Sequence, residues 1–142
     1  MKNKIIVGID FGISSIGVAV GQTLTGSSRP LIRIKVKEEN YNWYQFKKIF
    51  FDWRPELFII GISNDMNGKE KYLNKKIYKF ADFLHGIFKI PVIFHDERLT
   101  TIEAKNFLFT HGGYRMLTKD KIDAVSAVII LNSWMCNNTS YK

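Results

Sequence analysis

A short apolar run near the start of the chain constrains the fold more than any other feature of the sequence. Residues 5–9 are isoleucines, one valine and one glycine, and they lead into Asp10, Phe11 and Gly12. A run this short, rich in β-branched residues and ended by turn residues, is typical of a strand buried on both faces. Such a strand places Asp10 at the carboxyl edge, where open α/β sheets bind ligands. Asp10 and Gly12 are also ordinary turn residues, so a simple turn is the alternative.

Four further segments predict strands. Residues 16–21 form a second apolar run that pairs with the first as a hairpin, and a loop is expected over 22–28. Residues 57–62 and 91–95 repeat the signature of a buried strand. Residues 31–37 alternate apolar and basic, which predicts an edge strand with one solvated face. The solubilising charges of that face would be Arg33, Lys35 and Lys37.

Helices are predicted over residues 43–53, 69–89, 101–109 and 122–135. Asn40 is expected to cap the first, and Arg54-Pro55 to end it. The last is apolar nearly all round, so we expect it to pack deep against the sheet. Residues 111–121 are glycine-containing and basic, and they predict a mobile loop. The apolar positions expected on the second helix are Tyr72, Ile77, Phe80, Phe83, Leu84 and Ile87.

This order of elements predicts an α/β fold. We expect a mixed five-stranded sheet, three antiparallel strands followed by parallel strands, with helices on both faces. With 142 residues the chain suits one domain, predicted over 1–136, and residues 137–142 are expected to form a flexible tail.

Charge and cysteine content narrow the function. A net charge of +8 favours a polyanionic partner, with nucleic acid ahead of anionic membrane. No apolar run reaches the roughly 20 residues of a spanning helix, so no membrane partner is expected. A lone cysteine, Cys136, cannot form an internal disulfide and is predicted to be a packing residue. Together with the lack of a convincing secretory signal, this predicts a cytoplasmic protein.

Three carboxylates are expected to converge. Asp10 ends the first strand, Glu97 follows the last, and Asp123 lies in the first turn of the apolar helix. If the first and last strands are parallel, their carboxyl ends share one edge of the sheet, and the helix brings Asp123 alongside. Asp96 competes with Glu97 for this role, since the pattern does not separate them. Asp123 also suits a helix N-terminus without any ligand.

Converging carboxylates repel one another unless a cation lies between them. Oxygen ligands select hard ions such as Mg²⁺ or Mn²⁺, and in a basic protein they suit phosphodiester hydrolysis by metal-activated water. His95 would support a ligand or serve as a structural residue. Arg98 would contact a phosphate or pair with Asp96.

Several motifs in order resemble the YqgF-type family of Holliday junction resolvases and pre-16S ribosomal RNA nucleases. The resemblance runs from about residue 4 to residue 134. The motifs are Gly8-Ile9-Asp10-Phe11-Gly12, Ile16-Gly17-Val18-Ala19-Val20, His95-Asp96-Glu97-Arg98-Leu99-Thr100-Thr101, Gly112-Gly113-Tyr114-Arg115, and Asp123-Ala124-Val125-Ser126-Ala127. The chain departs from the family pattern at Ser14 and in the loop over 63–68, which lacks a proline.

The resemblance implies an RNase H-like fold and a metal-dependent nuclease that processes the 5′ end of pre-16S ribosomal RNA, in contact with the small-subunit precursor. Asp10 would bridge two metal ions, while Glu97 and Asp123 hold one each. Cleavage of four-way DNA junctions and RNA binding without cleavage, as a ribosome assembly factor, are the alternatives. We expect a monomer or weak dimer. The nucleic-acid contacts would come from Arg98, Arg115, Lys119 and Lys121.

Overall fold

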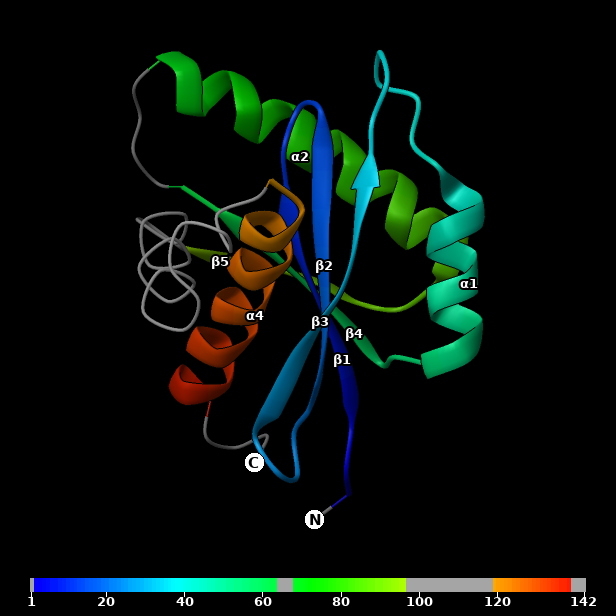
Figure 1. The fold of residues 1–142 in the computed structure, drawn as a ribbon, viewed down its shortest axis with the longest axis vertical. Coiled ribbons are helices and arrows are strands. Elements are labelled where there is room, and N and C mark those ends of the chain that lie inside the picture. Colours follow the sequence, from blue (N-terminus) through cyan, green and yellow to red (C-terminus); the bar gives the residue numbers. More distant parts are fainter. Residues whose placement is uncertain (1, 64–67, 97–118, 139–142) are drawn as a thin grey trace.

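The computed structural model describes residues 2–63, 68–96 and 119–138, and these form one mixed sheet with helices on both faces (Figure 1). The strands lie in the order β3-β2-β1-β4-β5, antiparallel from β3 to β1 and parallel from β1 to β5. This is the α/β architecture predicted from the order of elements. The strands are β1 (Ile5–Phe11), β2 (Ser15–Gln22), β3 (Ser27–Lys35), β4 (Leu57–Ile62) and β5 (Val92–Asp96).

Strand β3 begins earlier than predicted. Residues expected in a loop pair with the end of β2, Ser27 with Gln22 and Ser28 with Gly21. Pro30 pairs with Ala19, and it is tolerated because β3 is an edge strand. The register shifts between Val18 and Ala19, so one residue of β3 is extra there. Hydrophobic alternation does not mark such a bulge, which explains the misplaced loop.

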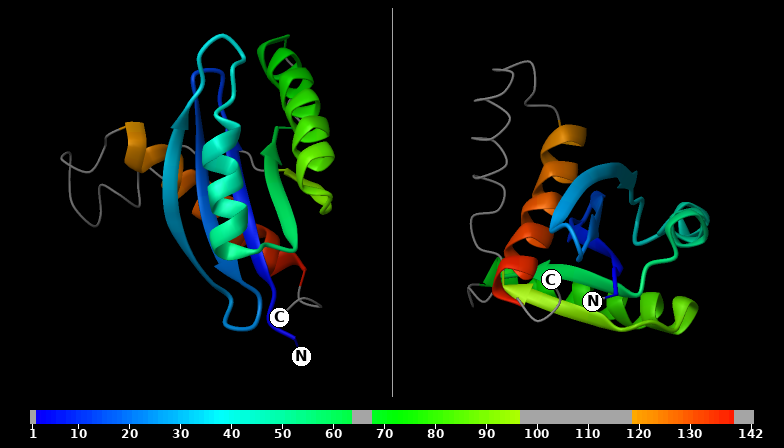
Figure 2. Two further views of the ribbon diagram at one scale, coloured as in Figure 1. Left: turned by 90° about the vertical axis from the view of Figure 1, so that its right-hand side faces the viewer. Right: turned by 90° about the horizontal axis from the view of Figure 1, so that it is seen from below.

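Helices α1 (Trp43–Trp53) and α2 (Gly68–Phe88) cover one face of the sheet (Figure 2). Asn42 caps α1 by accepting a hydrogen bond from the Gln45 amide, so the prediction of Asn40 was wrong by two residues. The buried stripe of α2 differs in part from the predicted one, because Tyr72, Phe83 and Ile87 are exposed. Among the described side chains of α2, the buried hydrophobic ones are Ile77, Phe80, Ala81, Leu84 and Phe88.

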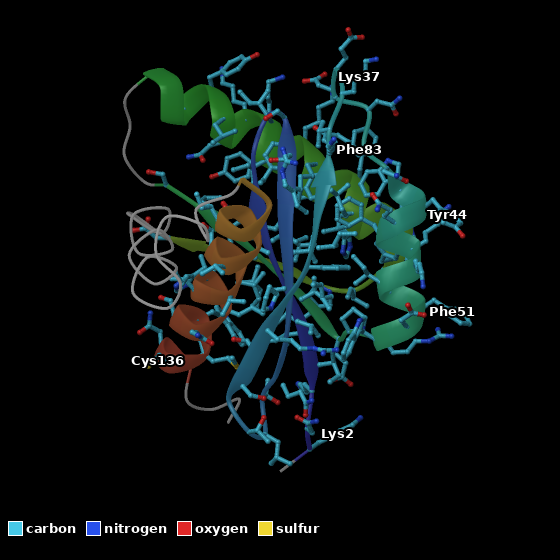
Figure 3. The ribbon with its side chains drawn as sticks, in the orientation of Figure 1. Lys2, Lys37, Tyr44, Phe51, Phe83 and Cys136 are labelled. Atoms are coloured by element: carbon cyan, nitrogen blue, oxygen red, sulfur yellow. The ribbon has the colours of Figure 1, made fainter. Side chains whose placement is uncertain are left out.

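Helix α4 (Lys119–Asn137) covers the other face, where Ala127, Ile130, Leu131 and Trp134 are buried. It begins at Lys119 rather than Ile122, so residues 119–121 are helical and do not belong to the predicted loop. The first turn is polar, and hydrophobic periodicity does not mark such a turn. Cys136 is exposed on the outer side of α4 and is no packing residue (Figure 3). Within residues 2–63, 68–96 and 119–138, no helix is long and apolar enough to cross a membrane.

Candidate active site at the carboxyl edge of the sheet

Asp10 lies near the end of β1, half-buried, on the face of the sheet that α4 covers. Its neighbours Ile9 and Phe11 pack into the opposite core with α1 and α2, so strand alternation assigns Asp10 to the α4 side. Gly12 makes the turn that follows: its amide donates to Ser15 O at 2.9 Å, and a Cβ on Gly12 would lie 2.8 Å from that oxygen. The turn and the strand-end carboxylate predicted from the sequence are therefore both present.

Glycines flank Asp10 on both sides. Asp10 is paired with Gly17 on β2. On β4, Ile60 is paired with Ile9, so the next row places Gly61 beside Asp10. Paired residues in a sheet extend their side chains to the same face. The residues directly beside Asp10 on β2 and β4 therefore place no side chain of their own next to its carboxylate.

Close packing at Gly8 fixes α4 over this part of the sheet. A Cβ on Gly8 would lie 2.5 Å from Leu131 Cγ and 2.9 Å from the Ala127 carbonyl oxygen. Helix α4 descends past the sheet while β1 rises, so the two run in opposite directions (Figure 1). Asp10 is two residues beyond Gly8, about 6.5 Å along the strand. Asp123 is one turn before Ala127, about 6 Å along the helix in the same direction. The backbone thus brings the two predicted acidic positions toward each other.

The carboxyl end of β5 reaches the same edge, because β5 and β1 are both parallel to β4. Asp96 is exposed and is paired with Ile62, whose side chain packs against the α1 and α2 core. Asp96 therefore belongs to the face opposite Asp10. Strand pairing argues against Asp96 as the partner of Asp10. Glu97, the other candidate, lies outside the described residues.

His95 precedes Asp96 on β5 and lies in the same row of the sheet as Asp10. It is paired with Gly61, on the α4 face, and its Nε2 lies 2.8 Å from Ser133 Oγ. The two atoms share a hydrogen bond whose direction depends on the tautomer of the imidazole ring. This contact ties β5 to α4 and gives His95 the structural role that was one of its two interpretations.

Arg33 is a residue that the sequence interpretation missed. Lys35 and Lys37 are exposed, as predicted for the charges of an edge strand, but Arg33 is half-buried. It is paired with Gly17, so it belongs to the same row and face as Asp10. The error came from treating the outer face of β3 as solvent, whereas α4 extends over it, as the 2.5 Å hydrogen bond from Ser28 Oγ to Asn132 Oδ1 shows. The available signal in the sequence was Gly17, which the predicted first hairpin pairs with Asp10 and which has no side chain to separate Asp10 from the next strand.

The remaining predicted site residues are described in part or not at all. Arg98 and Arg115 lie outside the described residues, as does Glu97. For Lys119, Lys121 and Asp123 the backbone belongs to α4, and their side chains are not described. Among the side chains that are described, no group of three His, Cys, Asp or Glu residues forms a metal site. The three-carboxylate centre therefore stays a prediction.

A hollow of about 290 Å³ lies at the other end of the first hairpin. Its lining includes Gln22, Ser27, Arg29 and Trp53, and Gln22 is paired with Ile5, at the opposite end of β1 from Asp10. The Arg29 guanidinium carbon stands 4.8 Å from the centre of the Trp53 ring. Among the described residues, no carboxylate lines this hollow, so it does not suit the predicted chemistry.

Comparison with known sequences matches nearly the whole chain to one family. The family model described as "RuvX: Holliday junction resolvase" matches residues 4–137. A protein of Proteus mirabilis named "Putative pre-16S rRNA nuclease" is 47% identical over 134 residues, which is 94% of this chain and 96% of the relative. A protein of the same name from Sodalis glossinidius is 48% identical over 130 residues, covering 92% of each.

Solved structures match at the level of the fold. T. thermophilus RuvC in complex with a Holliday junction superposes with a TM-score of 0.58 at 14% identity, covering 97% of both chains. The Fowlpox virus resolvase in complex with Holliday junction DNA gives 0.55 at 17% identity, covering 94% of this chain and 97% of the resolvase. The fold is therefore RNase H-like, as the motifs implied.

Proposed function

Because the chain belongs to the RuvX family of Holliday junction resolvases and pre-16S rRNA nucleases, we propose that it is a divalent-metal-dependent endonuclease that processes the 5′ end of pre-16S ribosomal RNA. The observation that carries this proposal is the setting of Asp10. It is a half-buried carboxylate at the carboxyl edge of the sheet, with glycines on both sides in its row and α4 packed over its face.

The proposed ligands are Asp10, Glu97 and Asp123. Carboxylate oxygens suit Mg²⁺ or Mn²⁺, and the two residues that flank Asp10 in its row are glycines, which do not crowd its carboxylate. When bound, a divalent cation would activate the attacking water and neutralise charge on the leaving oxygen. Of the chain's own residues, Asp10 would supply an oxygen ligand from the sheet. Asp123 would supply another from the second turn of α4, not from the first turn as predicted, because the helix begins at Lys119.

Basic residues would hold the nucleic acid. We assign this role to Arg98, Arg115, Lys119 and Lys121. The last two belong to the first turn of α4, at the end of the helix nearer to Asp10. The net charge of +8 supports attraction to a polyanion. We place the activity in the cytoplasm, on RNA of the small-subunit precursor, with the chain acting as a monomer or weak dimer.

Cleavage of four-way DNA junctions is the second candidate. It is favoured by the description of the family and by the fold that the chain shares with two junction resolvases. The same carboxylates would serve both reactions. The substrates differ in shape, and that difference is the basis of a direct test.

The test compares precursor 16S 5′-leader RNA with a four-way DNA junction, each in Mg²⁺, in Mn²⁺ and in chelator. We expect metal-dependent cutting of the RNA and little cutting of the junction. Preferential cutting of the junction would replace the proposal with the resolvase function. Tight RNA binding without cutting in either metal would contradict the nuclease proposal and favour the assembly factor.

A further inference from the structure

Arg33 occupies an unexpected place for a charged residue of an edge strand. It is half-buried and is paired with Gly17, which is paired in turn with Asp10. Arg33 and Asp10 are thus separated along the row only by a residue without a side chain. Two strand spacings correspond to about 10 Å between their Cα atoms. A guanidinium on a long side chain can cross much of that distance over Gly17.

The face on which Arg33 lies is that of the proposed active site. Ile32 and Ile34, its neighbours along β3, pack into the α1 and α2 core, so Arg33 belongs to the α4 side. Arg29, on the same strand, belongs to the other side, where it stacks on Trp53 of α1. Two arginines of one strand therefore lie on opposite faces of the sheet, one in the row of Asp10 and one remote from it.

The chemistry of the guanidinium suits a phosphate at this position. Arginine stays charged when partly buried, and its planar fork of donors matches phosphate oxygens in two-point contacts. A phosphodiester that approaches a cluster of carboxylates needs positive charge nearby. We propose that Arg33 forms a phosphate-binding site for the nucleic-acid substrate, next to Asp10 on the α4 face. This inference rests on the proposed nuclease function and adds a substrate contact to it.

The test measures binding in an Asp10→Asn parent, so that cleavage does not interfere. The affinity for 5′-leader RNA is measured over a series of salt concentrations for the parent, Arg33→Ala and Arg29→Ala. We expect Arg33→Ala to weaken binding and to reduce the log–log salt slope by about 0.7–1, the effect of one lost phosphate contact. Arg29→Ala removes the same charge from the same strand and is expected to keep the parental slope.

A merely structural role for Arg33 would lower the melting temperature and leave the salt slope unchanged. Equal slopes for Arg33→Ala and Arg29→Ala, or no measurable RNA binding by the parent, would overturn the proposal. If Arg33→Ala does not fold, Arg33→Gln replaces it, because glutamine keeps a long polar side chain without the charge. Arg33→Gln is expected to show the same reduced salt slope. Arg33→Lys is expected to keep the parental slope.

Cleavage by the otherwise wild-type chain separates this inference from the proposed function. With active protein, we expect Arg33→Ala to lower kcat/KM mainly through a higher KM. If the chain binds RNA without cutting it, the nuclease proposal fails, while a reduced salt slope for Arg33→Ala would still support the phosphate site.

Discussion

Gly8 shows how a single residue sets the geometry of the site. Its missing side chain lets α4 pack directly on β1, with Leu131 and the Ala127 carbonyl against the strand. Asp10 follows on the same face of the strand, and Asp123 precedes Ala127 by one helical turn. Any shift of α4 away from β1 would therefore also separate the two acidic positions.

Gly8→Ala is expected to destabilise the protein by about 1–3 kcal/mol, because the new methyl group would overlap Leu131 and the helix backbone. Gly86→Ala is the matched control, since nothing lies within 4 Å of a Cβ at that helical position. The control is expected to stabilise by about 0.5–1 kcal/mol. Denaturant unfolding measures both changes. Parental stability in Gly8→Ala would show that α4 is not held at this point.

The elements show which parts of the fold could be predicted from the sequence. Strands β1, β4 and β5 were found because their apolar runs are continuous, and α1 was found because its apolar stripe is regular. The start of β3 was missed, since its pairing depends on a register shift opposite Val18 and Ala19. Tyr72 and Phe83 fitted the helical period of α2, yet they are exposed. Hydrophobic periodicity predicts an apolar stripe along a helix, but only tertiary packing decides which residues of that stripe are buried.

The end of α2 offers a prediction at the scale of the element. Lys89 follows the helix with a φ of 61°, in the left-handed region that favours glycine, and its amide donates to His85 O at 2.9 Å. Lys89→Gly is expected to raise the free energy of unfolding by roughly 1 kcal/mol, because it removes the steric cost of a Cβ in that conformation. Lys89→Ala keeps the Cβ and is expected to gain nothing. Equal effects of the two substitutions in thermal unfolding would contradict this explanation.

At the scale of the whole molecule, the candidate site depends on how distant segments meet. The sequence predicted that strand ends and a helix N-terminus would share one edge, and the parallel β1, β4 and β5 with α4 across them confirm that arrangement. The place of Arg33 was not predictable from its own strand. It depends on β2 lying between β3 and β1, and on α4 extending over all three strands (Figure 2).

The same arrangement places Asp10 and Asp96 on opposite faces of the sheet. Asp10 belongs to the face under α4, whereas Asp96 is paired with Ile62 on the face of α1 and α2. Both are strand-end carboxylates at the same edge. A nuclease centre on the α4 face therefore requires Asp10 and does not require Asp96.

The most direct test of this account is the rate of RNA cleavage by Asp10→Asn and Asp96→Asn at saturating Mn²⁺. We predict that Asp10→Asn loses more activity than the roughly 10–100-fold typical of an outer-shell partner, because it removes a metal ligand. Asp96→Asn is predicted to cut at the parental rate. A parental rate for Asp10→Asn, or a loss confined to Asp96→Asn, would contradict the placement of the active site on the α4 face.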